Sequence, residues 1–175
     1  LNNRIKDGKT NEVILMSEAL HEKKIAEIAD KIAAKDGIKL VLIAGPSSSG
    51  KTTFAKRLGI QLRINGLKPV TIGTDNYFVE RPDTPLDENG DYDFETIDAL
   101  DLNLFNDHLT KLINGEEIEV PTFDFKIGSK KFLGNKMSLR EDEVLVIEGI
   151  HCLNDKLTAS IPDNEKFKIY ISDLT

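Results

Sequence analysis

The sequence contains one cysteine, Cys152, and no tryptophan. A single cysteine excludes an intrachain disulfide framework and is typical of proteins in a reducing cytoplasm. No apolar run approaches the ~20 residues that a membrane-spanning helix needs. The polar N-terminus also lacks the pattern of a secretory signal. We therefore expect a cytoplasmic protein with no membrane partner.

Positive charge is scarce as well. The sequence has 23 lysines and arginines and 30 aspartates and glutamates, so the net charge is -7 and the pI is about 5.0. A protein that binds duplex nucleic acid needs a basic stripe, so we expect no nucleic-acid partner. A small anionic ligand is still compatible with this composition, because a nest of backbone N–H groups can bind phosphate on an acidic protein.

Predicted strands and helices alternate along most of the chain. Apolar spacing predicts a helix from Ser17 to Gly37 and another over 101–113. Short continuous apolar runs at 40–44 and 144–147 are typical of buried parallel strands, and 70–72 and 167–171 are predicted as further strands. Residues 117–136 predict a β-hairpin excursion, and 79–98 a long ordered loop. The predicted class is α/β with a mainly parallel sheet.

A complete phosphate-binding loop follows the first predicted strand. The segment 45–52 matches G-x-x-x-x-G-K-[ST], and a predicted amphipathic helix comes directly after it. The glycines let backbone N–H groups point at phosphates, Lys51 would reach the β- and γ-phosphates, and Thr52 would ligate Mg²⁺. The fold expectation is thus a three-layer P-loop kinase core that binds ATP and Mg²⁺. The predicted nucleotide-binding residues are Gly45, Pro46, Ser47, Ser48, Ser49, Gly50, Lys51, Thr52 and Thr53.

Two acidic residues follow predicted strands. Asp75 comes after the 70–72 run, and Glu148 comes directly after the 144–147 run. Ligands bind beyond the carboxyl ends of strands in such sheets, so both carboxylates should project beside the phosphates. There a carboxylate can hold Mg²⁺ or accept a proton from an attacking hydroxyl. The alternative for either residue is a helix N-cap or a hydrogen bond within a loop.

These residues, with further segments, resemble the uridine kinase family from about Lys39 onward. The segments that carry the resemblance, in order, are 44–53, 75–78, 92–94, 121–125 and 147–150. The chain is most similar to bacterial uridine-kinase-like proteins with a threonyl-tRNA-synthetase-like N-terminal region. In that comparison residues 1–36 are a linker and helix from a preceding region, and 37–175 are the kinase core.

The resemblance implies transfer of the ATP γ-phosphoryl group to the 5′-hydroxyl of uridine or cytidine. Asp75 takes the position of the catalytic base and acts with Lys51, while Glu148 lies near the Mg²⁺ that Thr52 also binds. Asp93 falls near the ribose-binding aspartate of the family. Phe123 and Asp124 match the segment that lines the base pocket.

The chain departs from the family at the pyrimidine-binding side. Phe123 replaces a tyrosine, Gly128 replaces a base-contacting histidine, and Lys130 replaces an arginine. The family's lid, with its phosphate-clamping arginines, lies after the last predicted strand, so we expect the core to stop before it and, taken alone, to lack part of the catalytic equipment. Two alternatives therefore stay open: a nucleotide-binding module without transfer, and a kinase for another hydroxyl substrate such as a sugar phosphate. The sequence also leaves a homo-oligomer open.

The histidines are not expected to form a metal site, although His151 could approach the phosphate-binding site. His21 and His108 lie on predicted helical faces and should be solvated. His151 and Cys152 follow Glu148 closely, but a metal site would need further ligands that the sequence does not offer.

Overall fold

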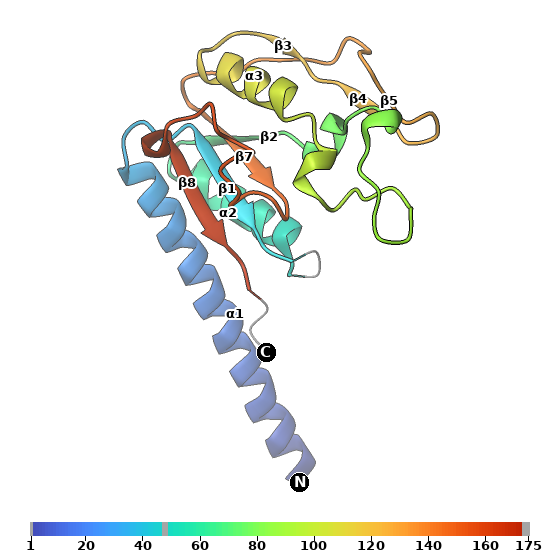
Figure 1. The fold of residues 1–175 in the computed structure, drawn as a ribbon. Helices are drawn as coiled ribbons and strands as arrows, with labels where there is room; N and C mark the ends of the chain where they lie inside the picture. The colour runs from blue at the N-terminus through green and yellow to red at the C-terminus, as the bar shows by residue number, and fades with distance from the viewer. Residues whose placement is uncertain (1, 47–48, 173–175) are drawn as a thin grey trace.

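The computed structural model describes residues 2–46 and 49–172, with side chains described from Gly8 onward. Its centre is a four-stranded sheet in the order β2-β7-β1-β8, in which every pairing is parallel (Figure 1). The strands are β1 (Leu40–Ala44), β2 (Lys68–Thr71), β7 (Glu143–Glu148) and β8 (Lys166–Tyr170). The prediction of an α/β fold with a mainly parallel sheet is confirmed.

Helices and small sheets cover both faces of this central sheet. Helix α1 (Asn2–Ala34) and helix α2 (Lys51–Ile64) lie on one face, and helix α3 (Leu102–Ile113) lies on the other (Figure 1). The buried apolar residues divide accordingly. Val41 and Ile43 of β1 belong to the apolar cluster between the sheet and helices α1 and α2. Leu40 and Leu42 belong to the apolar cluster between the sheet and helix α3. Burial on both faces explains why β1 and the middle of β7 are short continuous apolar runs, and it gives the fold three layers.

The α3 layer contains the excursion that the sequence predicts over 117–136. Strands β4 (Thr122–Asp124) and β5 (Ser129–Lys131) form an antiparallel hairpin, and β3 (Ile118–Glu119) pairs antiparallel with β6 (Lys136–Met137).

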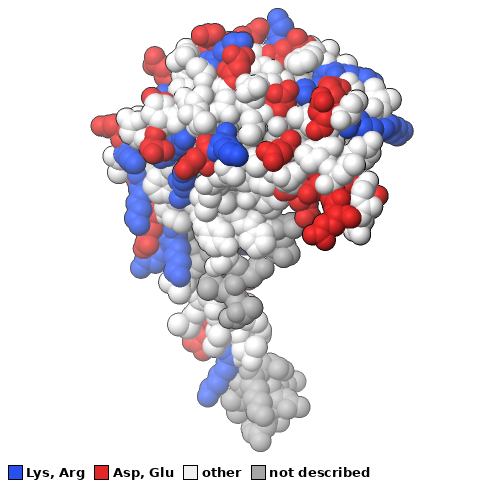
Figure 2. Space-filling view, viewed as in Figure 1, with Lys and Arg blue, Asp and Glu red and all other residues white. Residues whose placement is uncertain are grey.

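The 79–98 segment is a long ordered loop, as expected. It contains the short 3-10 turns η2 (Arg81–Asp83) and η3 (Ile97–Ala99), and one isolated bridge joins Leu86 to Tyr92. Acidic side chains gather at the right of Figure 2, and the exposed acidic residues of this loop are Asp83, Asp87, Glu88, Asp91, Glu95 and Asp98.

Helix α1 is longer than the predicted helix that begins at Ser17. It starts at Asn2, and its N-terminal half extends beyond the rest of the molecule (Figure 1). Every side chain from Gly8 to Leu20 is exposed, whereas Ile25, Ala29 and Ile32 are buried against the sheet layer. The protruding half has no buried face, so its sequence lacks the apolar period on which the prediction depended. No helix in the described part of the chain is long and apolar enough to cross a membrane.

His108 is buried, which corrects the expectation that it is solvated. Only 7% of the residue is exposed, and its Nδ1 atom lies 2.8 Å from the hydroxyl oxygen of Tyr77. The two rings are nearly perpendicular, with centroids 5.5 Å apart. Tyr77 belongs to the 3-10 turn η1 (Thr74–Tyr77), so this contact ties α3 to the turn that also contains Asp75. His21 is exposed, as predicted.

We expect the stability of the protein to fall on mild acidification because of His108. Burial lowers the pKa of His108 below its usual 6.5, against the opposing fields of Asp107 and Asp101 and together with that of Lys111. As the pH falls, His108 is therefore protonated in the unfolded chain before it is protonated in the folded protein. The contribution of neutral His108 to the free energy of unfolding is complete above pH 6.5 and is lost as the pH falls below that value. Urea unfolding of wild type and His108→Gln from pH 7.5 to 5 measures how the free energy of unfolding of each protein depends on pH. An equal loss of stability in both proteins would contradict the assignment.

Candidate functional site

The carboxyl ends of the four parallel strands bring the predicted site residues to one edge of the sheet. Ile43 of β1 lies opposite Glu148 of β7, and Ala44 lies opposite Tyr170 of β8. The chain leaves β2 at Thr71 and reaches Asp75 in turn η1. Since all strands point the same way, the phosphate-binding loop, Asp75 and Glu148 share this edge.

The phosphate-binding loop connects β1 to α2. Gly50 has φ 78° and ψ 26°, in the left-handed region that glycine adopts without strain, and it is the N-cap of α2. As a glycine, this N-cap residue has no side chain to cap the helix, which leaves the first N–H groups of α2 available to an anion. A Cβ atom on Gly45 would lie 2.5 Å from the carbonyl oxygen of Ile171, which excludes any larger residue without a shift of the backbone. Glycine at both of these positions of the pattern thus has a local steric reason.

The phosphate-binding segment also contains three serines and Thr53. Ser49 Oγ donates a hydrogen bond to the Pro46 carbonyl oxygen at 2.6 Å. Thr53 is an exposed residue in the first turn of α2. Ser47 and Ser48, which the pattern also assigns to nucleotide binding, lie outside the described residues.

Lys51 lies at the start of α2 and its ammonium group folds back over the loop. Its Nζ atom donates to the carbonyl oxygens of Gly45, at 2.8 Å, and Pro46, at 2.7 Å. These two neutral acceptors do not compensate the charge of the ammonium group, which therefore suits the phosphates of a nucleotide.

Thr52 and Glu148 form the candidate metal-binding pair. Thr52 Oγ1 donates to Glu148 Oε1 at 2.9 Å, while Glu148 Oε2 is buried and has no hydrogen-bond partner among the residues that the structure describes. A hydroxyl and a carboxylate with an unpaired oxygen fit Mg²⁺, which commonly takes one or two protein oxygens and fills its other positions with phosphate oxygens and water. No group of three or more His, Cys, Asp or Glu residues in the described part of the chain forms a larger metal cage.

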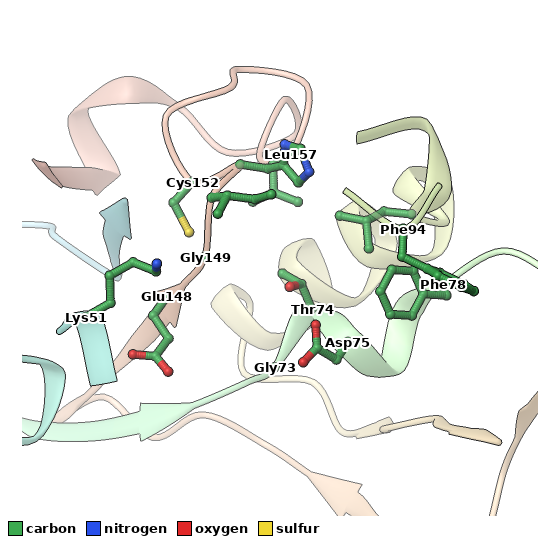
Figure 3. Close-up of a pocket in the computed structure, with 13 residues that line it drawn as sticks. Lys51, Gly73, Thr74, Asp75, Phe78, Phe94, Glu148, Gly149, Cys152 and Leu157 are labelled. Carbon is green, nitrogen blue, oxygen red and sulfur yellow. The ribbon is translucent and has the colours of Figure 1, made fainter. Parts of the chain in front are cut away.

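A cavity of about 370 Å³ joins this phosphate end to Asp75. Figure 3 shows Lys51 and Glu148 on one side of it, with Thr74 and Asp75 across from them. Beyond Asp75 the wall is apolar, and Phe78 and Phe94 project there from the η1 turn and the 79–98 loop. The other lining residues are Gly73, Leu100, Gly149, Ile150, His151, Cys152 and Leu157.

The predicted substrate-binding residues lie outside this lining. Phe123 is buried, and its ring centroid lies 5.5 Å from that of Phe78, so it supports the wall from behind. Asp124 forms an ion pair with Lys131 at 2.9 Å and accepts hydrogen bonds from the backbone N–H groups of its own turn. Asp93 likewise accepts from the N–H of Glu95.

Two of the departures from the family have structural reasons. Gly128 has φ 68°, and a Cβ atom there would lie 2.5 Å from Arg81 Nε, so a histidine would not fit beside that arginine. Lys130 is nearly buried; its Nζ atom donates to the Phe78 carbonyl oxygen at 2.7 Å and lies 3.1 Å from Asp101 Oδ2. Lys130 therefore fixes the cavity wall instead of facing the cavity.

Several lining residues escaped sequence reasoning. The aromatic position next to Asp93, Phe94, lines the cavity in place of the aspartate. His151 lines it too, and its place close after Glu148 in the sequence had already suggested that it could approach the site. Cys152 is buried, and burial raises the pKa of its thiol to about 12, so the thiol stays protonated and is no nucleophile.

Comparison with known proteins agrees with this geometry. Residues 40–174 match the model of the phosphoribulokinase / uridine kinase family. The chain is 31% identical over 129 residues to a uridine kinase of Halalkalibacterium halodurans, covering 73% of this chain and 59% of that protein. It is 36% identical over 124 residues to the inorganic pyrophosphatase TTM2 of Arabidopsis thaliana, covering 70% of this chain and 16% of that protein.

A solved structure titled as a possible uridine kinase from Bacillus stearothermophilus shares the fold. Its TM-score is 0.57 at 21% identity, with 84% of this chain and 80% of that chain covered. This chain spans only 52% to 59% of the length of three uridine kinases that it matches, those of Halobacterium salinarum, Halalkalibacterium halodurans and Brevibacillus brevis. The family match nevertheless covers more than half of the chain. The chain therefore belongs to the phosphoribulokinase / uridine kinase family.

Proposed function

We propose that the protein transfers the γ-phosphoryl group of MgATP to the 5′-hydroxyl of a pyrimidine nucleoside, uridine or cytidine. One observation supports this most directly: a single cavity connects the phosphate-binding loop to the Asp75 carboxylate and continues into an aromatic wall. The relatives named uridine kinase support the same substrate class.

Each part of the cavity has a chemical role in the proposed reaction. The α2 N-terminus and Lys51 hold the triphosphate and offset the charge on the γ-phosphoryl oxygens. Asp75 accepts the proton of the attacking hydroxyl as the new O–P bond forms and ADP leaves. Thr52 and Glu148 would hold Mg²⁺, which when bound supplies further positive charge at the phosphates.

The charge of the cavity favours an uncharged acceptor over a phosphorylated one. Among the described residues that line it, Lys51 is the one cation, and it lies at the phosphate-binding loop beside Glu148. Asp75 faces the space that the acceptor would occupy, and the wall beyond it is apolar. A sugar phosphate would find no cation for its own phosphate there and would approach a carboxylate of like charge, which costs affinity.

An ADP-release assay with a set of acceptors tests the proposed function. We expect turnover with uridine and cytidine, and more than about tenfold lower kcat/KM with ribulose 5-phosphate, because like charges oppose its binding. Incubation without an acceptor measures background ATP hydrolysis. ATP binding without transfer to any acceptor would instead indicate a nucleotide-binding module, and preferred turnover of the sugar phosphate would refute the nucleoside assignment.

A further inference from the structure

Two polar side chains that line the cavity, Thr74 and His151, have no role in the proposed phosphoryl transfer. Lys51 and Glu148 lie at the phosphate end, and Asp75 lies across from them with Thr74 beside it. The remaining hydrogen-bonding side chain of the described lining, apart from the protonated thiol of Cys152, is His151. Its Nε2 atom is buried and has no hydrogen-bond partner in the described part of the chain.

The turn that contains His151 is held firmly in place. The Gly149 N–H donates to the Ile43 carbonyl oxygen at 3.0 Å, which anchors the turn to β1. The Asn154 N–H donates to the carbonyl oxygen of His151 at 2.9 Å. Next to His151, the Cys152 side chain is buried and its Sγ atom donates to the Ile147 carbonyl oxygen at 3.5 Å. The backbone of His151 is therefore fixed at the cavity wall.

A buried ring nitrogen without a partner is unfavourable unless a ligand supplies one. The described residues form no metal cluster around His151, so a bound metal does not account for it. Other polar groups near the acceptor end are already occupied: Lys130 pairs with Asp101, and Asp124 pairs with Lys131. Of the two lining residues without a role, Thr74 and His151, His151 has the buried atom without a partner, so it is the stronger candidate for recognising a molecule in the apolar part of the cavity.

We propose that His151 binds the phosphoryl acceptor through a hydrogen bond from its ring to a hydroxyl or carbonyl group of that molecule. This inference rests on the proposed function for the identity of the acceptor. A neutral imidazole has one donor and one acceptor nitrogen, so it can pair with either kind of group. The phenylalanines Phe78 and Phe94 pack against the apolar part of the same acceptor, and His151 sets its orientation.

The variants His151→Leu and His151→Gln test this assignment by steady-state kinetics. We expect His151→Leu to raise KM for uridine about 10-fold or more, with the Kd of ATP unchanged, because one hydrogen bond to the acceptor is lost. His151→Gln replaces the imidazole with an amide that can still donate and accept hydrogen bonds, so its KM for uridine should lie between those of wild type and His151→Leu. Leu153→Ala, at an exposed position of the same turn, serves as the control. An unchanged KM in His151→Leu would overturn the inference.

A second measurement is independent of catalysis. The sequence has three histidines, so their ring resonances can be followed separately by NMR in the presence of uridine, cytidine or adenosine. A nucleoside should shift the ring signals of His151 and leave those of His21 and His108 unchanged. The same shift is expected in the Asp75→Asn variant, because the measurement reports binding and not transfer. A His151 shift without any transfer would support the inference while refuting the proposed reaction. Absence of a shift with all three nucleosides would overturn the inference.

Discussion

Replacing Lys51 with alanine should weaken ATP binding about 10- to 100-fold, since a charge-assisted interaction with the phosphates is lost. Phosphoryl transfer should fall further, by about 10²–10³-fold, because charge on the γ-phosphoryl oxygens grows in the transition state. Lys51 Nζ contacts two carbonyl oxygens of its own loop in the structure and belongs to neither apolar core. The fold should therefore survive the change.

Calorimetry with ATP and the ADP-release assay measure the two effects of Lys51→Ala. Lys56→Ala is the matched control, because it removes an exposed lysine from the same helix. Circular dichroism with thermal unfolding checks that each variant is folded. Equal ATP affinity in wild type and Lys51→Ala would mean that the loop does not bind the nucleotide as proposed.

Replacing Asp75 with asparagine should abolish most transfer while leaving ATP affinity intact. The carboxylate lies across the cavity from Lys51 and is placed to receive the proton of the acceptor hydroxyl (Figure 3). A positioned general base contributes about 10²–10⁴-fold to the rate, and an amide cannot accept that proton. The expected signature is a fall in kcat for uridine with little change in the Kd of ATP.

Asp83→Asn provides the comparison for Asp75→Asn, because Asp83 is exposed on the adjacent loop and does not line the cavity. Rate measurements on both variants, with ATP titrations, separate loss of chemistry from loss of binding. Full activity in Asp75→Asn would remove the aspartate from the mechanism. A parallel loss of ATP affinity would assign it to nucleotide binding instead.

The acidic residues show how far reasoning from the sequence extends. Placing Asp75 and Glu148 after parallel strands was enough to predict that both reach one edge of the sheet, and the structure shows them lining one cavity. The hydrogen bond from Thr52 to Glu148 joins α2 to β7, and only the packed structure reveals it. Their chemical roles remain predictions for the variants above to test.

The acceptor end of the site was harder to foresee. Neighbouring side chains in an extended segment point in different directions, so choosing between Asp93 and Phe94 requires the path of the loop. In the structure Phe94 lines the cavity, whereas Asp93 hydrogen-bonds within its own loop. His108 was misjudged for a related reason, because its burial depends on contact with Tyr77 from a distant turn.

The sequence by itself determined the phosphate-binding junction and the alternation of strands and helices. Both follow from local rules: glycine at positions of tight turn, and apolar runs whose length and period match a buried strand or a half-buried helix. Tertiary structure alone decided which side chains meet in the cavity. Turn η1, the 79–98 loop and the turn after β7 converge there, and their relative positions depend on how α3 and the β4–β5 hairpin pack over the sheet. That packing is a sum of long-range contacts, which no local pattern contains.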